Sequence, residues 1–385
     1  MKTNKILIIG AGLGGLALAQ GLVKAGFDVT VYERDVSPTS RTQGYRISIR
    51  SMGMQALSSL LPQDRANRLS TAKVADVGDG FTCANEKMEP IFTVPLGQAA
   101  SVQFLRSELK KLLQEDIKIE WNKHLIHFEV KDEQVIAHFE DGSSATGDLL
   151  VGCDGVGSTV RELLPSLYND KLGSIPKVIP CNRAILGGQI DRTTEWEALL
   201  PLNKTGIVRF QGPYSHYMAV CFSERADRSP TVFWAFAEDM EDNDAWYQMD
   251  EDYHIRILDH CKKLIDDGAW HPNLQKLIHA TPAEAIMPPW FISTTRFPET
   301  DHFPIVPSGR VTLLGDAAHA MPNERALGGN NVLEDARVLS ELLVSEADWP
   351  KVVEKFEREM YSRAKTAVQE SEGAAEYFRN MLSNK

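Results

Sequence analysis

The sequence has few of the residues that crosslink a chain or bind a structural metal. Its 385 residues include an odd number of cysteines: Cys83, Cys153, Cys181, Cys221 and Cys261. No two of them form a Cys-x-x-Cys pair, which argues against a zinc site or a disulfide framework and favours a reducing compartment. His124 and His127 fall in a strand pattern that would point their rings to opposite faces. We therefore expect no metal site and a cytoplasmic location.

The sequence also lacks a long uninterrupted apolar run and an excess of basic charge. Glycines interrupt the apolar stretch from Ile6 to Leu22 and Lys24 follows it closely, which argues against a signal peptide or a membrane span. The formal net charge is −12, so a general nucleic-acid-binding surface is not expected. A chain of this length most often divides into two domains. We expect a monomer or dimer that acts on small molecules.

The order of apolar patterns predicts an α/β unit interrupted by a β-rich insertion. Buried strands are predicted at Lys5–Ile9 and Val29–Tyr32, with a helix between them over Leu16–Ala25. The remaining predicted segments are a helix over 106–113, alternating strands over 118–151, a strand-rich region over 177–237, helices within 246–278, an extended Pro-rich connection over 282–307, a strand at 311–314 and helices from there to the end. The sequence shows no internal repeat.

Gly10-x-Gly12-x-x-Gly15 stands between the first predicted strand and its helix, the context that a dinucleotide-binding turn requires. Gly10 permits a tight turn, Gly12 leaves room for a pyrophosphate, and Gly15 lets the helix pack closely on the strand. The helix N-terminus would offer free amides to the phosphates. Glu33 ends the next strand, about 20 residues on, where an acid can bond ribose hydroxyls. The pattern occurs once, so we see no second domain dedicated to a dinucleotide.

A second glycine-bearing loop begins at Gly315, directly after the strand predicted at 311–314. It sets the carboxylate of Asp316 at a strand end and then enters an apolar-periodic helix. Together with the first turn it forms a two-point clamp for a long cofactor, which indicates FAD. Asp154-Gly155 follows another apolar strand and is either a further ligand element or only a turn, while Ser158 can cap the next helix.

These three motifs, in this order and at these separations, resemble those of the class A (group A) FAD-dependent monooxygenases. That family includes aromatic hydroxylases, tetracycline-inactivating enzymes and natural-product tailoring enzymes. The resemblance covers nearly the whole chain and implies an α/β fold: a Rossmann-like FAD-binding domain of glutathione-reductase type, an inserted β-sheet substrate domain and a helical C-terminus. The implied limits are 1–73, 101–176 and 290–345 for the FAD-binding domain, 74–100 and 177–289 for the substrate domain, and 346–385 for the C-terminal segment.

The resemblance also implies which residues hold FAD. The first turn and Glu33 would hold the ADP half, Arg106 the middle of the cofactor and Asp316 the ribityl chain, while the loop over 322–330 would run beside the isoalloxazine. Asp154 and Gly155 match a motif thought to serve both FAD and NAD(P)H. The full set is Gly10, Gly12, Leu13, Gly14, Gly15, Glu33, Arg34, Gly44, Arg46, Arg106, Asp154, Gly155, Asp316, Pro322, Gly328, Gly329 and Asn330.

The loop beside the flavin departs from the family pattern. Many relatives carry Pro-Pro-x-Gly-Gly-x-Gly, whereas this chain has Pro-Asn-Glu-Arg-Ala-Leu-Gly over 322–328. The changes at Asn323 and Ala326 affect the space where oxygen would react. They leave open an FAD-bound redox-neutral cyclase or isomerase, or an FAD oxidase, in a secondary-metabolite pathway.

Three residues are candidates for catalysis. Arg183 and Tyr217 match positions where similar enzymes place polar groups facing the flavin, and they could stabilise negative charge and donate a proton. The alternatives are a surface arginine and an interface tyrosine. Arg46 is either a pocket cation or a structural ion-pair partner, and His319 is expected to pack or to brace its loop. The resemblance implies an FAD enzyme that takes electrons from NADPH or NADH and inserts one atom of O₂ into a small aromatic or natural-product-like molecule.

Overall fold

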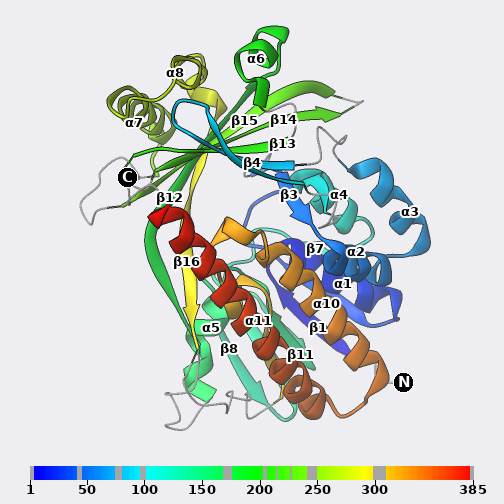
Figure 1. Cartoon of the computed structure of the whole chain (residues 1–385). Helices are drawn as coiled ribbons and strands as arrows, with labels where there is room; N and C mark the ends of the chain where they lie inside the picture. The colour runs from blue at the N-terminus through cyan, green and yellow to red at the C-terminus, as the bar shows by residue number, and fades with distance from the viewer. Residues whose placement is uncertain are drawn as a thin grey trace.

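The computed structural model describes residues 4–40, 46–73, 80–95, 101–167, 176–202, 206–213, 216–225, 228–240, 249–297 and 309–381. Gly44, expected to line the flavin, lies outside these ranges. Figure 1 shows an α/β unit that contains the N-terminus and, above it, a large sheet that carries its own helices. None of the helices in the described ranges has an apolar stretch long enough to cross a membrane.

The α/β unit is built on a five-stranded parallel sheet with the order β17-β11-β1-β2-β7. Ile6, Leu7 and Ile8 of the central strand are fully buried. Parallel strands covered on both faces are continuous apolar runs, which is why the sequence predicts them well. The strands are β1 (Lys5–Ile9), β2 (Asp28–Tyr32), β7 (Ile119–Glu120), β11 (Leu149–Gly152) and β17 (Val311–Leu313).

Two long helices lie against each other on this sheet. α1 packs on α10 through glycine: a Cβ added at Gly14 would lie 2.2 Å from Val332 Cγ2. The helices of this unit are α1 (Leu13–Lys24), α2 (Ser51–Leu60), α3 (Gln63–Ala72), α4 (Arg106–Gln114), α5 (Thr159–Leu163), α9 (Asp316–His319) and α10 (Gly328–Ser345), with 3₁₀ turns η2 (Leu164–Leu167) and η7 (Asn323–Arg325). Two small antiparallel sheets complete it, β8 (Leu125–Lys131) with β9 (Gln134–Phe139) and β10 (Ser144–Gly147), and β3 (Arg46–Ile49) with β6 (Val102–Leu105).

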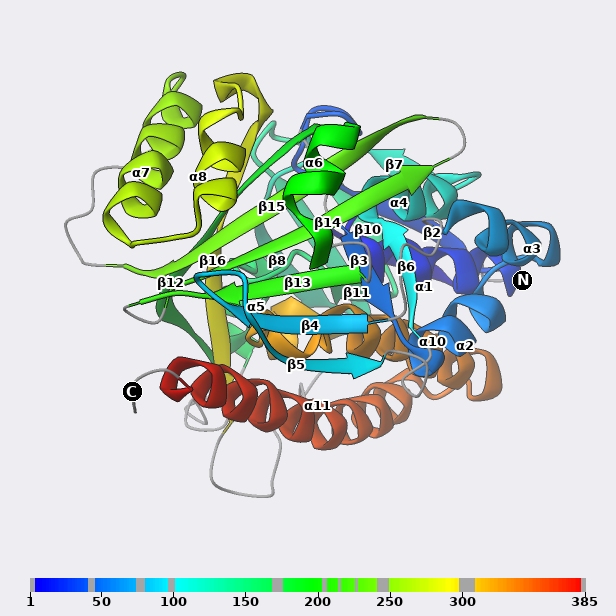
Figure 2. The ribbon, with the colours of Figure 1, turned by 45° about the horizontal axis from the view of Figure 1, so that its top comes forward.

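The second unit is a seven-stranded sheet with the order β16-β12-β15-β14-β13-β4-β5 (Figure 2). Residues of β14 alternate between its faces. Met218, Val220 and Phe222 belong to a core shared with α6, α7 and α8, whereas Tyr217 belongs to a small separate cluster on the other face. The elements are β4 (Gly80–Asn85), β5 (Pro90–Pro95), β12 (Lys177–Asp191), α6 (Thr194–Leu199), β13 (Gly206–Gln211), β14 (Tyr217–Arg225), β15 (Arg228–Asp239), α7 (Tyr253–Asp267), α8 (Pro272–His279), η6 (Ala283–Ala285) and β16 (Ile286–Arg296).

Strand β16 differs from the prediction of an extended connection over 282–307. Residues 286–296 form an edge strand that pairs with β12, and residues 298–308 lie outside the described part. Pro288 and Pro289 concealed the strand, because proline cannot donate a ladder hydrogen bond. They are tolerated because β16 is an edge strand and its register with β12 shifts between Ile185 and Gly187.

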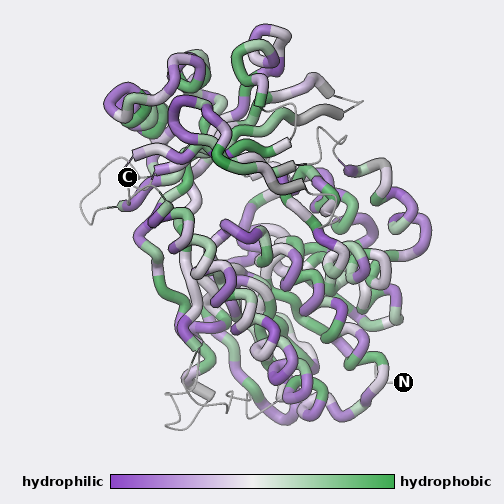
Figure 3. The backbone as a smooth tube through the Cα atoms, in the orientation of Figure 1, coloured by the Kyte–Doolittle hydropathy of each residue, from purple (hydrophilic) through white to green (hydrophobic). Residues whose placement is uncertain are grey.

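Helix α11 (Trp349–Asn380) links the two units. Its N-terminal half buries Val353, Phe356 and Met360 in the core of the α/β unit, as the apolar stripe predicted. Its C-terminal end reaches the large sheet, where Phe378 contacts Arg209 of β13. Figures 1 and 2 show this helix running across both units, and Figure 3 shows many hydrophilic residues along it, as expected for a helix with one exposed face.

Candidate active site

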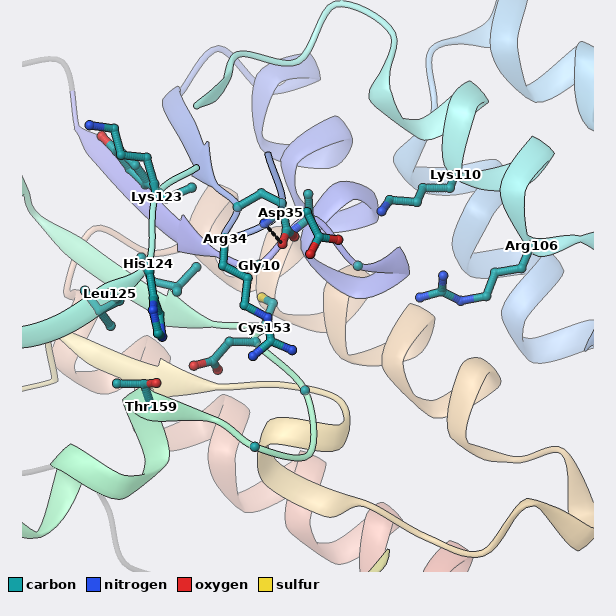
Figure 4. A pocket seen from close by; sticks show the side chains of 18 residues that line it. Gly10, Arg34, Asp35, Arg106, Lys110, Lys123, His124, Leu125, Cys153 and Thr159 are labelled. Atoms are coloured by element: carbon teal, nitrogen blue, oxygen red, sulfur yellow. Dashed lines mark hydrogen bonds between the residues drawn. The ribbon is translucent and has the colours of Figure 1, made fainter. Parts of the chain in front are cut away.

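A cavity of about 180 Å³ opens at the carboxyl end of β1, where the glycine turn leads into α1 (Figure 4). The turn, the end of β2 and the loop after β11 meet there. This is the edge of a parallel sheet where ligands of α/β folds bind. Of the residues expected to hold the cofactor, the cavity is lined by Gly10, Gly12, Glu33, Arg34, Arg106, Asp154 and Gly155.

The three fingerprint glycines meet different constraints. Gly10 has a φ of +105°, and a Cβ there would lie 2.5 Å from the carbonyl oxygen of Cys153. A Cβ at Gly15 would lie 2.2 Å from the carbonyl oxygen of Gly10. At Gly12 the nearest atom to an added Cβ is 3.9 Å away, so the protein itself leaves that side open. The turn thus keeps free space beside the N-terminus of α1, as a pyrophosphate requires.

Glu33 holds the turn together from the end of β2. Its side chain accepts hydrogen bonds from the backbone N–H of Ala11 (2.7 Å) and of Asp35 (3.0 Å). The residue is only 8% exposed. Each carboxyl oxygen keeps a further acceptor position, so the residue can brace the turn and still receive a ribose hydroxyl.

Basic side chains surround this cavity. Figure 4 shows Arg34 reaching toward its centre from the chain just after β2, and Arg106 and Lys110 reaching toward it from α4. Lys110 was not among the expected residues, although it lies one helical turn after Arg106 on α4, a spacing that places both on one face. Such a set favours a ligand with negative charge.

The side chain of Asp154 forms hydrogen bonds within its own loop and the helix that follows it. Its carboxylate accepts a hydrogen bond from the hydroxyl of Ser158 (2.5 Å) and one from the N–H of Val160 (3.2 Å). Ser158 caps α5 by accepting from the N–H of Arg161, which confirms the cap expected from the sequence. Burial raises the pKa of Asp154 above its usual value. Gly155 follows with a φ of +81° and lets the loop turn past the cavity.

The second loop turns at Gly315, which has a φ of +65°. It presents Asp316 at the start of α9, opposite the first residues of α10: a Cβ added at Gly328 would lie 3.8 Å from Asp316 Oδ1. Burial raises the pKa of this carboxyl, while His319 and Arg106 favour its charged form. The charge of Arg106, which lines the first cavity, therefore also acts on Asp316 of the second loop.

A buried ionic network stands behind the second loop. The Nε2 atom of His319 lies 2.7 Å from Asp335 Oδ2, which also accepts the N–H of Gly315 (2.9 Å), and Arg363 of α11 donates to Asp335 Oδ1 (2.8 Å). Burial opposes a charge on His319, but Asp335 outweighs it and the imidazole pKa is raised. Burial likewise opposes ionisation of Asp335, yet His319 and Arg363 hold its pKa below the usual value. His319 braces its loop through Asp335, and neither Asp335 nor Arg363 could be identified from the sequence.

The rest of the loop is shaped by Asn330 and Ala326. The buried amide of Asn330 donates to the carbonyls of Ser48 (3.0 Å) and Ala326 (2.8 Å) and accepts from the N–H of Arg50 (2.7 Å). Ala326 has a left-handed backbone, with φ of 50°. Asn330 therefore acts by fixing the loop against β3. Pro322 is also buried, and a Cβ at Gly329 would press on Ile47.

The face of the large sheet toward this loop carries the candidate catalytic residues. Arg183 is buried, forms an ion pair with Asp239 (2.7 Å), and lies 5.5 Å from the centre of the Tyr217 ring. Arg209, which sequence reasoning missed, stacks on that ring at 3.6 Å. Burial raises the pKa of Tyr217, and Asn323 of the loop lies close enough to its hydroxyl to oppose that rise.

Arg46 lies apart from this group. It reaches from β3 to the thiol of Cys221 on the same sheet face. The structure thus brings Arg183 and Tyr217 together and sets Arg46 at another point of the face.

Comparison with known proteins also points to an FAD-binding enzyme. A family model described as "FAD binding domain" matches residues 3–259 and 299–371. The chain is 28% identical over 346 residues to the FAD-dependent monooxygenase thnD of Trichoderma harzianum, covering 88% of this chain and 82% of that one. It is 27% identical over 358 residues to the 6-hydroxynicotinate 3-monooxygenase of Pseudomonas fluorescens, covering 89% and 83%.

A solved structure gives the same result. The crystal structure of a putative FAD-containing monooxygenase from Photorhabdus luminescens superposes with a TM-score of 0.78 at 25% identity and covers 99% of this chain and 100% of that one. The open side of Gly12, the cations around the cavity and the placement of Asp316 fit a long anionic dinucleotide. The chain belongs to the FAD-binding-domain family, among the aromatic-hydroxylase-like FAD-dependent monooxygenases, and is an oxidoreductase with FAD as its cofactor.

Proposed function

We propose that this enzyme takes electrons from NADPH or NADH and inserts one atom of O₂ into a small aromatic or natural-product-like molecule. The reaction would be a hydroxylation, an epoxidation or a Baeyer–Villiger oxidation. The observation that carries the proposal is the position of Tyr217. Tyr217 lies on the face of the large sheet that is turned toward the loop expected to border the flavin, and Asn323 of that loop lies close to its hydroxyl. A substrate between sheet and loop would meet both.

The residues of the two loops would hold FAD in an extended form. The N-terminus of α1 beside Gly12 would bind the pyrophosphate, Glu33 a ribose, Arg106 the middle of the cofactor and Asp316 the ribityl chain. Gly14, Gly329 and Asn330 would act by packing and loop shape rather than by direct polar contact. Bound FAD supplies electron transfer and oxygen activation, and the protein supplies binding, orientation and electrostatics.

The sheet face would position the substrate and manage charge. The buried guanidinium of Arg183, held by Asp239, can stabilise negative charge that develops on the substrate or the cofactor. The hydroxyl of Tyr217 can donate a proton, because burial keeps it protonated at neutral pH. Arg46 would add positive charge near Cys221. The FAD-binding domain would comprise 1–73, 101–176 and 290–345, the substrate domain 74–100 and 177–289, and the C-terminal helical segment 346–385.

The test uses the FAD-loaded protein with hydroxylated naphthalenes and pyridines as probe substrates. We expect at least one probe to accelerate NADPH or NADH oxidation more than tenfold and to gain one ¹⁸O atom from ¹⁸O₂. Product formed without oxygen and without nicotinamide cofactor would indicate the redox-neutral alternative instead. Hydrogen peroxide equal to product, with no ¹⁸O in the product, would indicate an oxidase.

A further inference from the structure

Two neighbouring lysines on α4 have different surroundings. Lys111 is exposed and forms an ion pair with Glu108 of the same helix (3.1 Å). Lys110 is only 8% exposed and lines the cavity at the glycine turn, and Figure 4 shows its side chain directed toward that cavity. Water screens a charge at the wall of a partly buried cavity less than a charge on an open surface. An anion in this cavity would therefore be attracted strongly by the ammonium group of Lys110.

Two other cations of the cavity occupy different positions. Arg34 comes from the chain just after β2, and Figure 4 shows it on the opposite side of the cavity from α4. Lys123 forms an ion pair with Asp141 (2.6 Å). The positive charge on the α4 side of the cavity thus comes from Arg106 and Lys110, which lie one helical turn apart on one face of the helix.

The N-terminus of α1 offers only part of the charge that a pyrophosphate needs. Gly12 is the N-cap residue and has no side chain that could occupy the backbone amides, and residues 13–16 of the first turn include no acid. The helix dipole contributes about half a unit of positive charge there, whereas both phosphates of a pyrophosphate are charged at neutral pH. Arg106 adds one charge, but that charge also acts on Asp316. Lys110 brings a further full charge to the same cavity.

We propose that Lys110 pairs with the pyrophosphate of FAD and determines how tightly the protein retains the ADP half of the cofactor. The ammonium group would reach the phosphate oxygens from α4, while the amides beside Gly12 bind them from α1. Lys111, the next residue, would have no part in binding FAD. This inference rests on the proposed position of the pyrophosphate at the N-terminus of α1.

The test titrates FAD into the full-length protein from which FAD has been removed, at low and at high NaCl concentration. Lys110→Met should lower the affinity for FAD at least tenfold, because it removes a charge-assisted hydrogen bond. High salt should weaken FAD binding by the wild type at least fivefold, and by Lys110→Met less than half as much, since a charge pair subject to screening is gone. Lys111→Met, the matched control, should behave as the wild type does.

ADP as a competitor of FAD locates the contact. If Lys110 binds the pyrophosphate, Lys110→Met should lower the affinity for ADP by the same factor as for FAD, within threefold. A loss for FAD with no loss for ADP would place the contact outside the ADP half and would overturn the proposal.

A second variant and a stability measurement guard against misfolding. Replacement of a buried ionic group by an apolar side chain of similar volume is often neutral for stability, so Lys110→Met should keep the thermal unfolding midpoint of the wild type. Lys110→Gln removes the charge but keeps a hydrogen-bond donor, and its affinity for FAD should fall at least threefold. FAD affinity within twofold of the wild type in a folded Lys110 variant, an equal loss in Lys111→Met, or an unchanged salt dependence in Lys110→Met would contradict the role of Lys110.

The variant Gly12→Ala separates this proposal from the one on which it rests. Weaker FAD binding by Gly12→Ala with unchanged binding by Lys110→Met would contradict only the role of Lys110. Unchanged binding by both variants would contradict the proposed position of the pyrophosphate itself. The titrations need neither nicotinamide cofactor nor oxygen, so their outcome is independent of the proposed oxygen insertion.

Discussion

The two loops that border the site both join a buried parallel strand to a helix, but they are held in different ways. The turn from Gly10 to Gly15 is fixed by backbone packed on backbone, where a Cβ at Gly15 would lie 2.2 Å from a carbonyl oxygen. The loop that begins at Gly315 is fixed by side chains from distant segments, above all Asp335 and Arg363. We therefore expect added side-chain volume to destabilise the first loop most strongly, and removal of a charge to destabilise the second.

The largest effect should come from volume in the first loop. Gly15→Ala should lower the free energy of unfolding by about 3 kcal/mol and abolish FAD retention, because the new methyl group meets backbone that cannot move aside. Gly12→Ala is the matched variant, since its methyl group meets no protein atom closer than 3.9 Å. It should fold normally and bind FAD at least tenfold more weakly. Urea unfolding and FAD titration check both, and identical behaviour of the two variants would break the comparison.

Charge in the second loop should give the next largest effect. The pKa of His319 is raised above 6.5 in the folded state, so its stabilisation is complete below pH 6.5 and is lost as pH rises through the folded value. The pKa of Asp335 is lowered from 3.8, so its stabilisation holds above pH 3.8 and is lost as pH falls through the folded value. The free energy of unfolding of the wild type, measured in urea, should therefore fall above pH 6.5, by at most about 1.4 kcal/mol per pH unit.

The variant His319→Gln tests this directly. It should cost about 3 kcal/mol at pH 6 and remove the slope above pH 6.5, because it breaks a buried ion pair. His279→Gln is the control, since its pair with Asp266 is exposed. It should leave the slope unchanged. A wild type whose stability stays constant between pH 6.5 and pH 9 would contradict the network as described.

A side-chain brace also exists in the first loop, and its removal should have a smaller effect. Glu33→Ala leaves the N–H groups of Ala11 and Asp35 without their acceptor and should lower the free energy of unfolding by about 2 kcal/mol. FAD affinity should fall as well, because a ribose partner is lost. Chemical unfolding and FAD titration measure the two effects separately. Full FAD affinity in this variant would remove Glu33 from the cofactor site.

The smallest effect is expected at Ala326. Its left-handed backbone costs about 1 kcal/mol for a residue with a Cβ, but glycine there would gain nearly as much freedom in the unfolded chain. Ala326→Gly should therefore change the free energy of unfolding by less than about 0.5 kcal/mol. Thermal unfolding checks this, and a large loss of stability would mean that the methyl group makes a contact that the loop needs.

The contrast between the loops also explains how much the sequence could reveal. Gly10, Gly12, Gly15 and Glu33 follow one another at fixed spacings along a short segment, so a local pattern was enough to find them. Lys110 could have been found in the same way from its helical spacing to Arg106. The edge strand β16 was missed because its two prolines contradict the usual strand composition.

Other parts of the site depend on contacts between distant segments. Arg363 of α11 reaches Asp335, the partner of His319, only after α10 and α11 pack together. Arg209 and Glu324 come close only because η7 lies against the large sheet. No spacing in the sequence signals such contacts. The departure of the loop over 322–328 from the family pattern marked this region as unusual, but it did not indicate which residues of the large sheet the loop contacts.

A crystal structure of the FAD-loaded protein is the most direct test of the account. We predict that the pyrophosphate lies at the N-terminus of α1 beside Gly12, with the adenosine ribose at Glu33 and the ribityl chain at Asp316. The flavin ring should then lie beside the loop over 322–330, with the substrate space between it and the sheet face that carries Tyr217. FAD bound with its pyrophosphate away from α1, or with its ring remote from Asp316, would contradict the arrangement on which the proposed chemistry depends.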